Sequence, residues 1–186
     1  MFDGYRIIFW GIFFVTFHIN LGSIPILPAF VGYMMVSRGL SHLIEEKTSS
    51  HFDQAKRMSY WLTLLGVVSF LLPLVQYESI LLSYFPIAFS MLELLLVSYI
   101  LEGSIECFQG EGSSSLADDY RAEQKGYTIL QTIFILGSAA AITLASTGIS
   151  FVVILFGIFL RIWFMAILGR LKRTWENQTE EHGGSL

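Results

Sequence analysis

Two prolines, Pro25 and Pro28, interrupt the long apolar stretch at residues 17–43. The runs on either side have roughly the 20-residue length that a helix needs to cross the hydrocarbon core of a bilayer. Proline is tolerated in the first turn of a helix, because its missing N–H would have no intrahelical partner there. We therefore predict a membrane hairpin in which helix 5–21 is followed, after a reversal, by helix 24–43 with both prolines in its first turns.

Composition extends this prediction to the whole chain. Of the 186 residues, 54% are hydrophobic and 14% charged, and mean hydropathy is +0.62; soluble domains carry about 25% charged residues. We expect an all-α membrane protein, an antiparallel bundle of six transmembrane helices within residues 1–174, followed by a flexible cytoplasmic tail at 175–186. The six expected spans are 5–21, 24–43, 58–76, 79–101, 127–146 and 149–168.

Small residues recur at helical spacing in three of these runs, which predicts faces where a neighbouring helix approaches closely. These faces are Gly11, Val15, His18 and Gly22 in the first run, Gly32, Val36 and Gly39 in the second, and Gly137, Ala141 and Ala145 in the fifth.

Polar segments separate the runs at one end of the predicted bundle. Ser50 with Asp53, and Ser115 with Asp118, have the spacing of capped helix starts. Residues 102–126 form the longest polar segment, which we expect to be a loop that ends in the second of these starts.

The basic residues predict the orientation. Ten of the eleven lysines and arginines lie at or near one set of helix ends, and the eleventh lies inside the sixth run. The ten are Arg6, Arg38, Lys47, Lys56, Arg57, Arg121, Lys125, Arg170, Lys172 and Arg173. By the positive-inside rule this end is cytoplasmic, so we expect a multi-pass protein of the cell (inner) membrane with both termini in the cytoplasm. The same residues suit anionic lipid headgroups, and we expect no nucleic-acid partner.

The eleventh basic residue, Arg161, falls inside the sixth run, and Glu93 falls inside the fourth. At about 1.5 Å of rise per residue the two side chains reach the same depth. An unpaired charge there costs roughly 3 kcal/mol or more, so such residues pair or line a polar cavity. We predict an ion pair between Glu93 and Arg161.

Three further polar residues lie within the predicted spans: His18, Tyr33 and Gln131. Together with Glu93 and Arg161 they are the candidate ligand-binding residues, with the guanidinium as a forked donor for a small polar or anionic solute. The alternatives stay open that the ion pair only fixes helix packing and that His18 faces the headgroups.

Other chemistry finds little support in the sequence. Two groups with helical spacing, His42 with Glu45 and Glu46, and Glu102 with Glu106, lie where the chain leaves the predicted membrane, which favours solvated faces over metal sites. Cys107 is the single cysteine, and H-E-x-x-H, G-x-S-x-G and Walker-type motifs are absent from the sequence. We expect no catalytic residues, no metal and no cofactor.

A short segment carries a resemblance. Residues 26–33, ILPAFVGY, followed by Gly39 and Leu40, resemble a signature of small uncharacterised multi-pass membrane proteins of Gram-positive bacteria. Members of that group often have an acidic residue where Ala29 stands, so the chain departs from the pattern there. The resemblance covers about the first third of the chain and implies a bacterial membrane location, without an activity or site residues.

Three functions compete at this point. The first is a small-solute binding or transport subunit, similar in size and topology to the substrate-capturing subunits of energy-coupling vitamin transporters and needing an ATPase partner. The second is a membrane anchor, sensor or regulatory subunit that pairs with another membrane protein or with itself. The third, an intramembrane enzyme, ranks last because only one pair of chemically active residues shares a depth.

Overall fold

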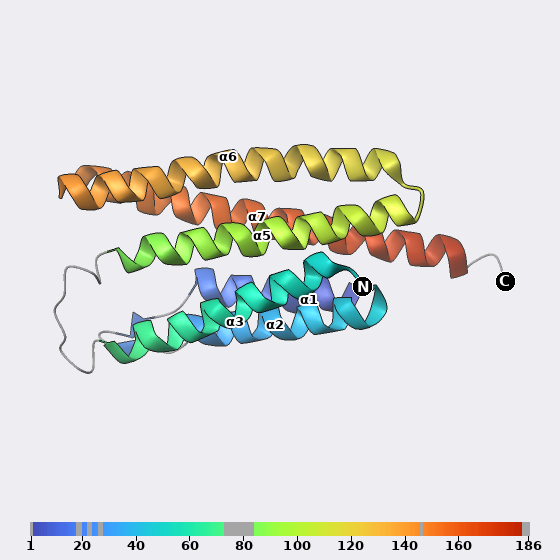
Figure 1. The fold of residues 1–186 in the computed structure, drawn as a ribbon, viewed down its shortest axis with the longest axis horizontal. Coiled ribbons are helices and arrows are strands. Elements are labelled where there is room, and N and C mark those ends of the chain that lie inside the picture. The colour runs from blue at the N-terminus through green and yellow to red at the C-terminus, as the bar shows by residue number, and fades with distance from the viewer. Residues whose placement is uncertain are drawn as a thin grey trace.

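The computed structural model describes residues 2–17, 20–21, 24–25, 28–72, 84–145 and 147–183. These residues form six helices that run alternately up and down the long axis of the molecule (Figure 1). The helices are α1 (Phe2–Thr16), α2 (Ala29–Glu46), α3 (Ser50–Leu71), α5 (Phe85–Gly110), α6 (Ser114–Leu144) and α7 (Thr147–Gly183). Between α1 and α2, the two-residue strands β1 (Asn20–Leu21) and β2 (Ile24–Pro25) pair antiparallel.

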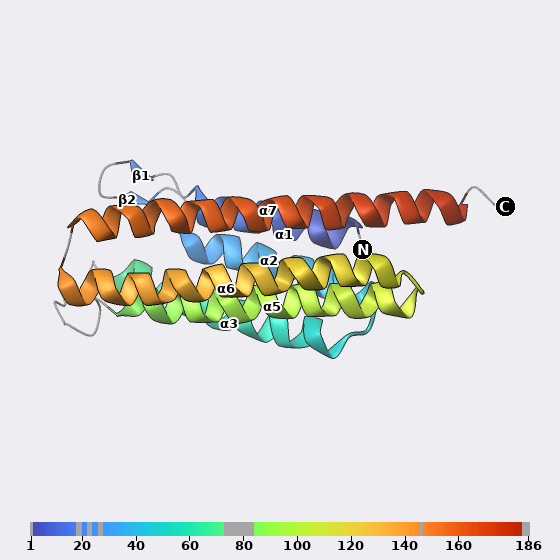
Figure 2. The ribbon, with the colours of Figure 1, turned by 90° about the horizontal axis from the view of Figure 1, so that it is seen from above.

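The helices close into a ring. Each described helix packs against the next in the sequence, and α7 returns to pack against α1, beside which it lies in Figure 2. The start of α1 and the end of α7 lie at the same end of the bundle (Figure 1). The predicted all-α, six-helix architecture is thus confirmed.

Three of the described helices are long and apolar enough to cross a membrane: α5, α6 and the part of α7 at Thr147–Asn177. The described part of α1 is only 15 residues long, and α2 and α3 each carry several charged residues near one end. That all six helices span a bilayer stays a prediction.

The first two helices are shorter than expected. α1 ends at Thr16 instead of residue 21, and α2 begins at Ala29 instead of residue 24. Our placement of both prolines in the first turn of the second helix is therefore wrong. Pro28 is the extended N-cap residue of α2, and Pro25 lies in β2. The residue before a proline avoids helical backbone angles, which agrees with the extended Ile24.

The polar segment at 102–126 is helical instead of a loop. α5 continues to Gly110 and α6 begins at Ser114, so only a tight turn remains, in which Gly112 has a φ of 76°. Glycine adopts this left-handed conformation without the steric cost that a Cβ would add. The predicted helix starts are displaced by one or two residues: Ser113 is the N-cap of α6, and Ser49 caps α3 by accepting a hydrogen bond from the His51 N–H at 3.2 Å.

Aromatic packing explains why the helices extend here. Phe108 of α5 lies between two rings, Tyr120 of α6 at 5.4 Å and Trp175 of α7 at 4.8 Å between ring centroids, both nearly parallel to it. Trp175 is only 6% exposed. Residues from 175 onward, which we expected to form a flexible tail, continue α7 to Gly183, and Trp175 packs this helix against Phe108 of α5.

The predicted close approach of the first two helices is present. A Cβ added at Gly11 would lie 2.7 Å from the Gly32 carbonyl oxygen, and one added at Gly39 would lie 2.7 Å from the carbonyl oxygen of Gly4. The two glycine pairs thus let the backbones of α1 and α2 touch. Of the predicted faces, His18 and Gly22 lie outside the described residues.

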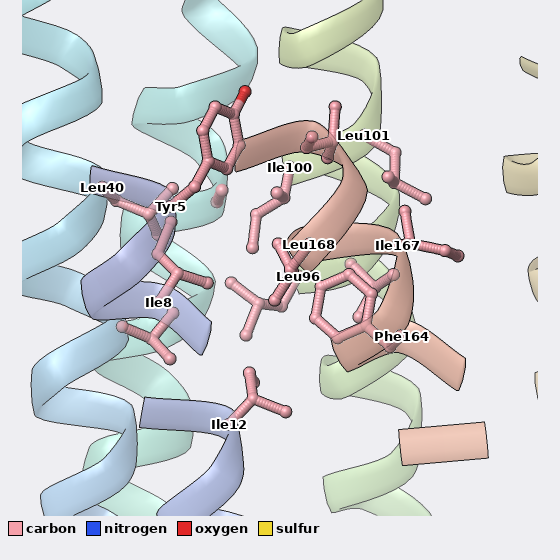
Figure 3. Close-up of a cluster of buried hydrophobic side chains, with 14 of the residues drawn as sticks. Tyr5, Ile8, Ile12, Leu40, Leu96, Ile100, Leu101, Phe164, Ile167 and Leu168 are labelled. Carbon is pink, nitrogen blue, oxygen red and sulfur yellow. The ribbon is translucent and has the colours of Figure 1, made fainter. Parts of the chain in front are cut away.

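The ring interior is packed with apolar side chains. Figure 3 shows residues of α1, α2, α5 and α7 pointing toward one another, among them Ile8, Leu40, Leu96 and Phe164, all of them at most 1% exposed. Tyr5 belongs to the same cluster, and its hydroxyl lies 2.7 Å from Ser104 Oγ. Nearer the opposite end of the bundle, this packing gives way to polar groups.

Candidate functional site

The predicted ion pair links α5 and α7. An Nη2–H of Arg161 donates to Glu93 Oε1 at 2.7 Å. The Glu93 side chain is 13% exposed and the Arg161 side chain 32% exposed, so the pair is largely withdrawn from the surface, with the guanidinium the more accessible member. The predicted contact between Glu93 and Arg161 is therefore present.

Tyr33 brings α2 to the same carboxylate. Its phenolic O–H donates to Glu93 Oε1, the oxygen that also accepts from Arg161. The ring is 1% exposed, and the backbone carbonyl of Tyr33 accepts from Ser59 Oγ of α3 at 2.7 Å. Of the predicted site residues, Tyr33 thus lies in direct contact with the ion pair.

A contact not expected from the sequence comes from α1. A second guanidinium nitrogen, Nη1 of Arg161, donates to the backbone carbonyl of Val15 at 3.3 Å. The last four carbonyls of a helix have no intrahelical partner and carry a partial negative charge. Because α1 ends at Thr16, these carbonyls lie inside the bundle, where a cation stabilises them.

A cavity of about 480 Å³ adjoins the ion pair. Its polar wall includes Glu93, Arg161 and Gln131, the last on α6 and only 3% exposed. The described residues that line it are Thr16, Pro86, Ser90, Glu93, Gln131, Phe134, Ile154, Gly157, Ile158 and Arg161. Ion pair and cavity together therefore draw on five helices, α1 and α2 through Val15 and Tyr33, while α3 supports them through the hydrogen bond of Ser59 to the Tyr33 backbone.

Two hydroxyls on the cavity wall are already engaged as donors. Ser90 Oγ donates to the Pro86 carbonyl at 2.9 Å, and Thr16 Oγ1 donates to the Ile12 carbonyl at 2.8 Å. Their oxygens can still accept hydrogen bonds. The sequence analysis did not select either residue, because serine and threonine in a helix most often bond to the preceding turn in this way.

The apolar wall depends on a glycine. A Cβ added at Gly157 would lie 2.8 Å from the ring of Phe134. The absence of a side chain at 157 thus lets α6 and α7 approach while the ring stays against the cavity. A larger residue at 157 would fill this space.

The remaining candidates lie elsewhere. His18 lies outside the described residues, so its place relative to the cavity is untested. The group around His42 is solvated, with its imidazole 3.8 Å from Glu45. Glu102 accepts from Gln124 at 2.7 Å, and Glu106 accepts from Ser49 Oγ. Within the described ranges, His, Cys, Asp and Glu residues form no group of three that could hold a metal ion.

Ion pairs hold the basic end together. Lys47, between α2 and α3, contacts Glu111 of the α5–α6 turn at 2.8 Å, and this hydrogen bond raises the pKa of the Lys47 ammonium. Arg170 of α7 pairs with Glu123 of α6. These contacts lie far along the helices from Glu93 and serve the packing of the helix ends.

Comparison of the chain with protein-family models, with curated proteins and with solved structures finds no match. The functional argument therefore depends on the site itself.

Proposed function

We propose that this chain is an integral membrane protein whose six helices all cross the bilayer and whose cavity binds a small polar solute, as a binding or transport subunit. The observation that supports this proposal is the contact between the cavity and the ion pair. Ionisable residues that line a cavity within a membrane are by default candidates for a functional site. Here about 480 Å³ of space adjoins Glu93 and Arg161, within the range of small-molecule sites.

The position of the cavity suits a pathway across a membrane. Its lining residues belong to the first half of α5, the second half of α6 and the first half of α7, such as Ser90, Phe134 and Ile154. In each of these helices that half is the one away from the bundle end where the ten other basic residues lie. With the basic end in the cytoplasm and the spans at 79–101, 127–146 and 149–168, the cavity lies around the middle of the bilayer, with Glu93 and Arg161 slightly to its cytoplasmic side.

The groups around the cavity favour binding over catalysis. Glu93 already accepts from Arg161 and Tyr33, and Arg161 also donates to Val15. Such a network positions donors and acceptors for a solute. The sequence contains no Walker-type loop, so uphill transport would draw its energy from a partner ATPase or from an ion gradient.

Retention of solutes by the purified protein tests the proposal. The protein in lipid nanodiscs is incubated with a polar metabolite extract, and the retained compounds are identified by mass spectrometry. Gly157→Leu should abolish retention, because a Cβ at 157 would lie 2.8 Å from the Phe134 ring, and the two side chains cannot both keep their places on the cavity wall. Gly169→Leu is the matched control, since no neighbouring atom lies within 4 Å of a Cβ at Gly169.

Identical retained compounds in wild type and Gly157→Leu would contradict the proposal. The anchor or regulatory function would then be favoured, with a stoichiometric membrane partner co-purifying.

A further inference from the structure

We infer that the solute in this cavity carries no net charge: it is neutral or zwitterionic, and it has an apolar part. The inference rests on the proposed binding function and narrows the class of ligand. It replaces the wider expectation, drawn from Arg161 alone, of a polar or anionic solute.

The first argument is the charge of the cavity wall. Among its described lining residues, Glu93 and Arg161 are the charged ones, and they are 2.7 Å apart. Their charges cancel. A solute with net charge would therefore enter a site of low dielectric without an opposite charge to pair with, a situation that membrane proteins avoid.

Two nitrogens of the Arg161 guanidinium already make hydrogen bonds within the protein. One donates to Glu93 and the other to the Val15 carbonyl at the negative end of α1. Glu93 in turn accepts from Tyr33 at Oε1, the same oxygen that accepts from Arg161. An anion would have to displace this carboxylate from a place fixed by two donors, whereas a dipolar group can add to the pair without breaking it.

The cavity wall has a polar part and an apolar part. Gln131 and the oxygens of Ser90 and Thr16 lie with the ion pair among the polar lining groups. The other lining residues are apolar: Pro86, Phe134, Ile154, Gly157 and Ile158. A ligand complementary to both would place a polar or dipolar end at Arg161 and Gln131 and an apolar part against Phe134.

The test measures which charge the cavity admits. Ser90→Cys is made in a Cys107→Ser background; Ser90 is 7% exposed and lines the cavity, so its thiol is reached through that space. The probes are three methanethiosulfonates: neutral methyl, anionic sulfonatoethyl and cationic trimethylammonioethyl. Leu155→Cys, exposed on α7 and not among the cavity residues, is the control. It measures how far an apolar environment outside the cavity changes the rates of the three reagents.

At each position we compare the reaction rate of the neutral reagent with the rates of the charged reagents. This ratio should be at least about tenfold larger at position 90 than at position 155, because an unpaired charge in the cavity is costly. Glu93→Gln should then raise the rate of the anionic reagent at position 90, and Arg161→Gln should raise that of the cationic one. Neither change should alter the rates at position 155. A cavity that selects only by size would not show this exchange.

Three results would overturn the inference. An anionic reagent that matches the neutral one at position 90 would show an anion site, with the proposed binding function intact. A preference unchanged by Glu93→Gln and Arg161→Gln would show that the paired charges do not set it. Failure of all three reagents at position 90, with normal reaction at 155, would show a closed cavity and remove the proposed function as well.

Discussion

Arg161 holds three helices together through one planar group. Its guanidinium donates to a carboxylate of α5 and to a carbonyl of α1 while its own backbone belongs to α7. Lysine could not reproduce this, because an ammonium is a point charge without the fixed fork of donors. The residue therefore stabilises the ring at the place where α7 meets α1.

Removing this side chain should be costly. Arg161→Ala leaves the Glu93 carboxylate buried without its cation, and breaking a buried pair in this way costs about 3 kcal/mol or more. Thermal unfolding in detergent measures the loss. Arg121→Ala is the control, since the exposed pair of Arg121 with Asp118 at 3.5 Å is worth at most about 1 kcal/mol. Equal effects of the two substitutions would refute a structural role for the inner pair.

Exchanging the two charges should restore only part of this stability. In Glu93→Arg with Arg161→Glu, the Coulomb attraction returns, but a carboxylate at 161 would face the Val15 carbonyl, which needs a donor. We expect the double variant to melt between wild type and Arg161→Ala. A double variant as stable as wild type would show that the Val15 contact contributes nothing.

The sequence could predict this site in part. Glu93 and Arg161 are charged residues at equal depth in apolar runs, and the cost of burying them made a pair the favourable solution. Val15 could not be predicted, because it takes part through its backbone, and its carbonyl is available only because α1 ends one residue later. Apolar residues continue past that point at Phe17, Ile19 and Leu21, so hydrophobicity alone placed the helix end later, at residue 21.

At the scale of elements, α1 and α2 form the closest pair. Glycines face one another at two levels, Gly11 with Gly32 and Gly4 with Gly39, with backbone oxygens where a side chain would otherwise be. Backbone atoms cannot move aside as a flexible side chain can. The pair therefore behaves as one rigid hairpin, which presents the end of α1 to Arg161.

A single methyl group should disturb this hairpin. Gly11→Ala would place its Cβ 2.7 Å from the Gly32 carbonyl oxygen, and we expect a loss of about 1–3 kcal/mol from overpacking. Gly169→Ala in α7 has open space around the new Cβ and should stabilise by up to about 1 kcal/mol through helix propensity. A lower melting temperature for Gly11→Ala and a higher one for Gly169→Ala would support the close packing of α1 against α2. A stabilising Gly11→Ala would exclude it.

Helix bounds were the weakest part of the sequence analysis. Residues 102–126 are polar, and polarity alone suggested a loop. Their apolar members, such as Ile105, Phe108 and Tyr120, are buried in the core cluster that also contains Trp175 of α7. Ile105 and Phe108 in α5, and Ala117 and Tyr120 in α6, are each three residues apart, a spacing typical of amphipathic helices.

At the scale of the whole molecule, the charge distribution gives the ring two unlike ends. Lys47, Arg121 and Arg170 lie near the end formed by the α2–α3 link and the α5–α6 turn, whereas the α6–α7 link lies at the other (Figure 1). By the positive-inside rule we expect the first end in the cytoplasm.

Two glycines with open space around them allow a matched test of this orientation. Gly110 ends α5 and Gly148 lies in the first turn of α7, at opposite ends of the bundle. In a Cys107→Ser background, a membrane-impermeant maleimide should label Gly148→Cys in intact cells and Gly110→Cys only after permeabilisation. The reverse pattern would invert the predicted topology.

Closure of the ring by its first and last helices has a consequence for biogenesis. Glu93 precedes Arg161 by 68 residues, which at about 5–20 residues per second is roughly 3–14 seconds of translation. During that interval, Glu93 in the membrane would have Tyr33 as a hydrogen-bond partner but no arginine, and α1 would lack its contact with α7. Before α7 is made, the chain would be an open intermediate of five helices in which Glu93 lacks its cationic partner. We expect this intermediate to be sensitive to quality-control proteases until Arg161 docks.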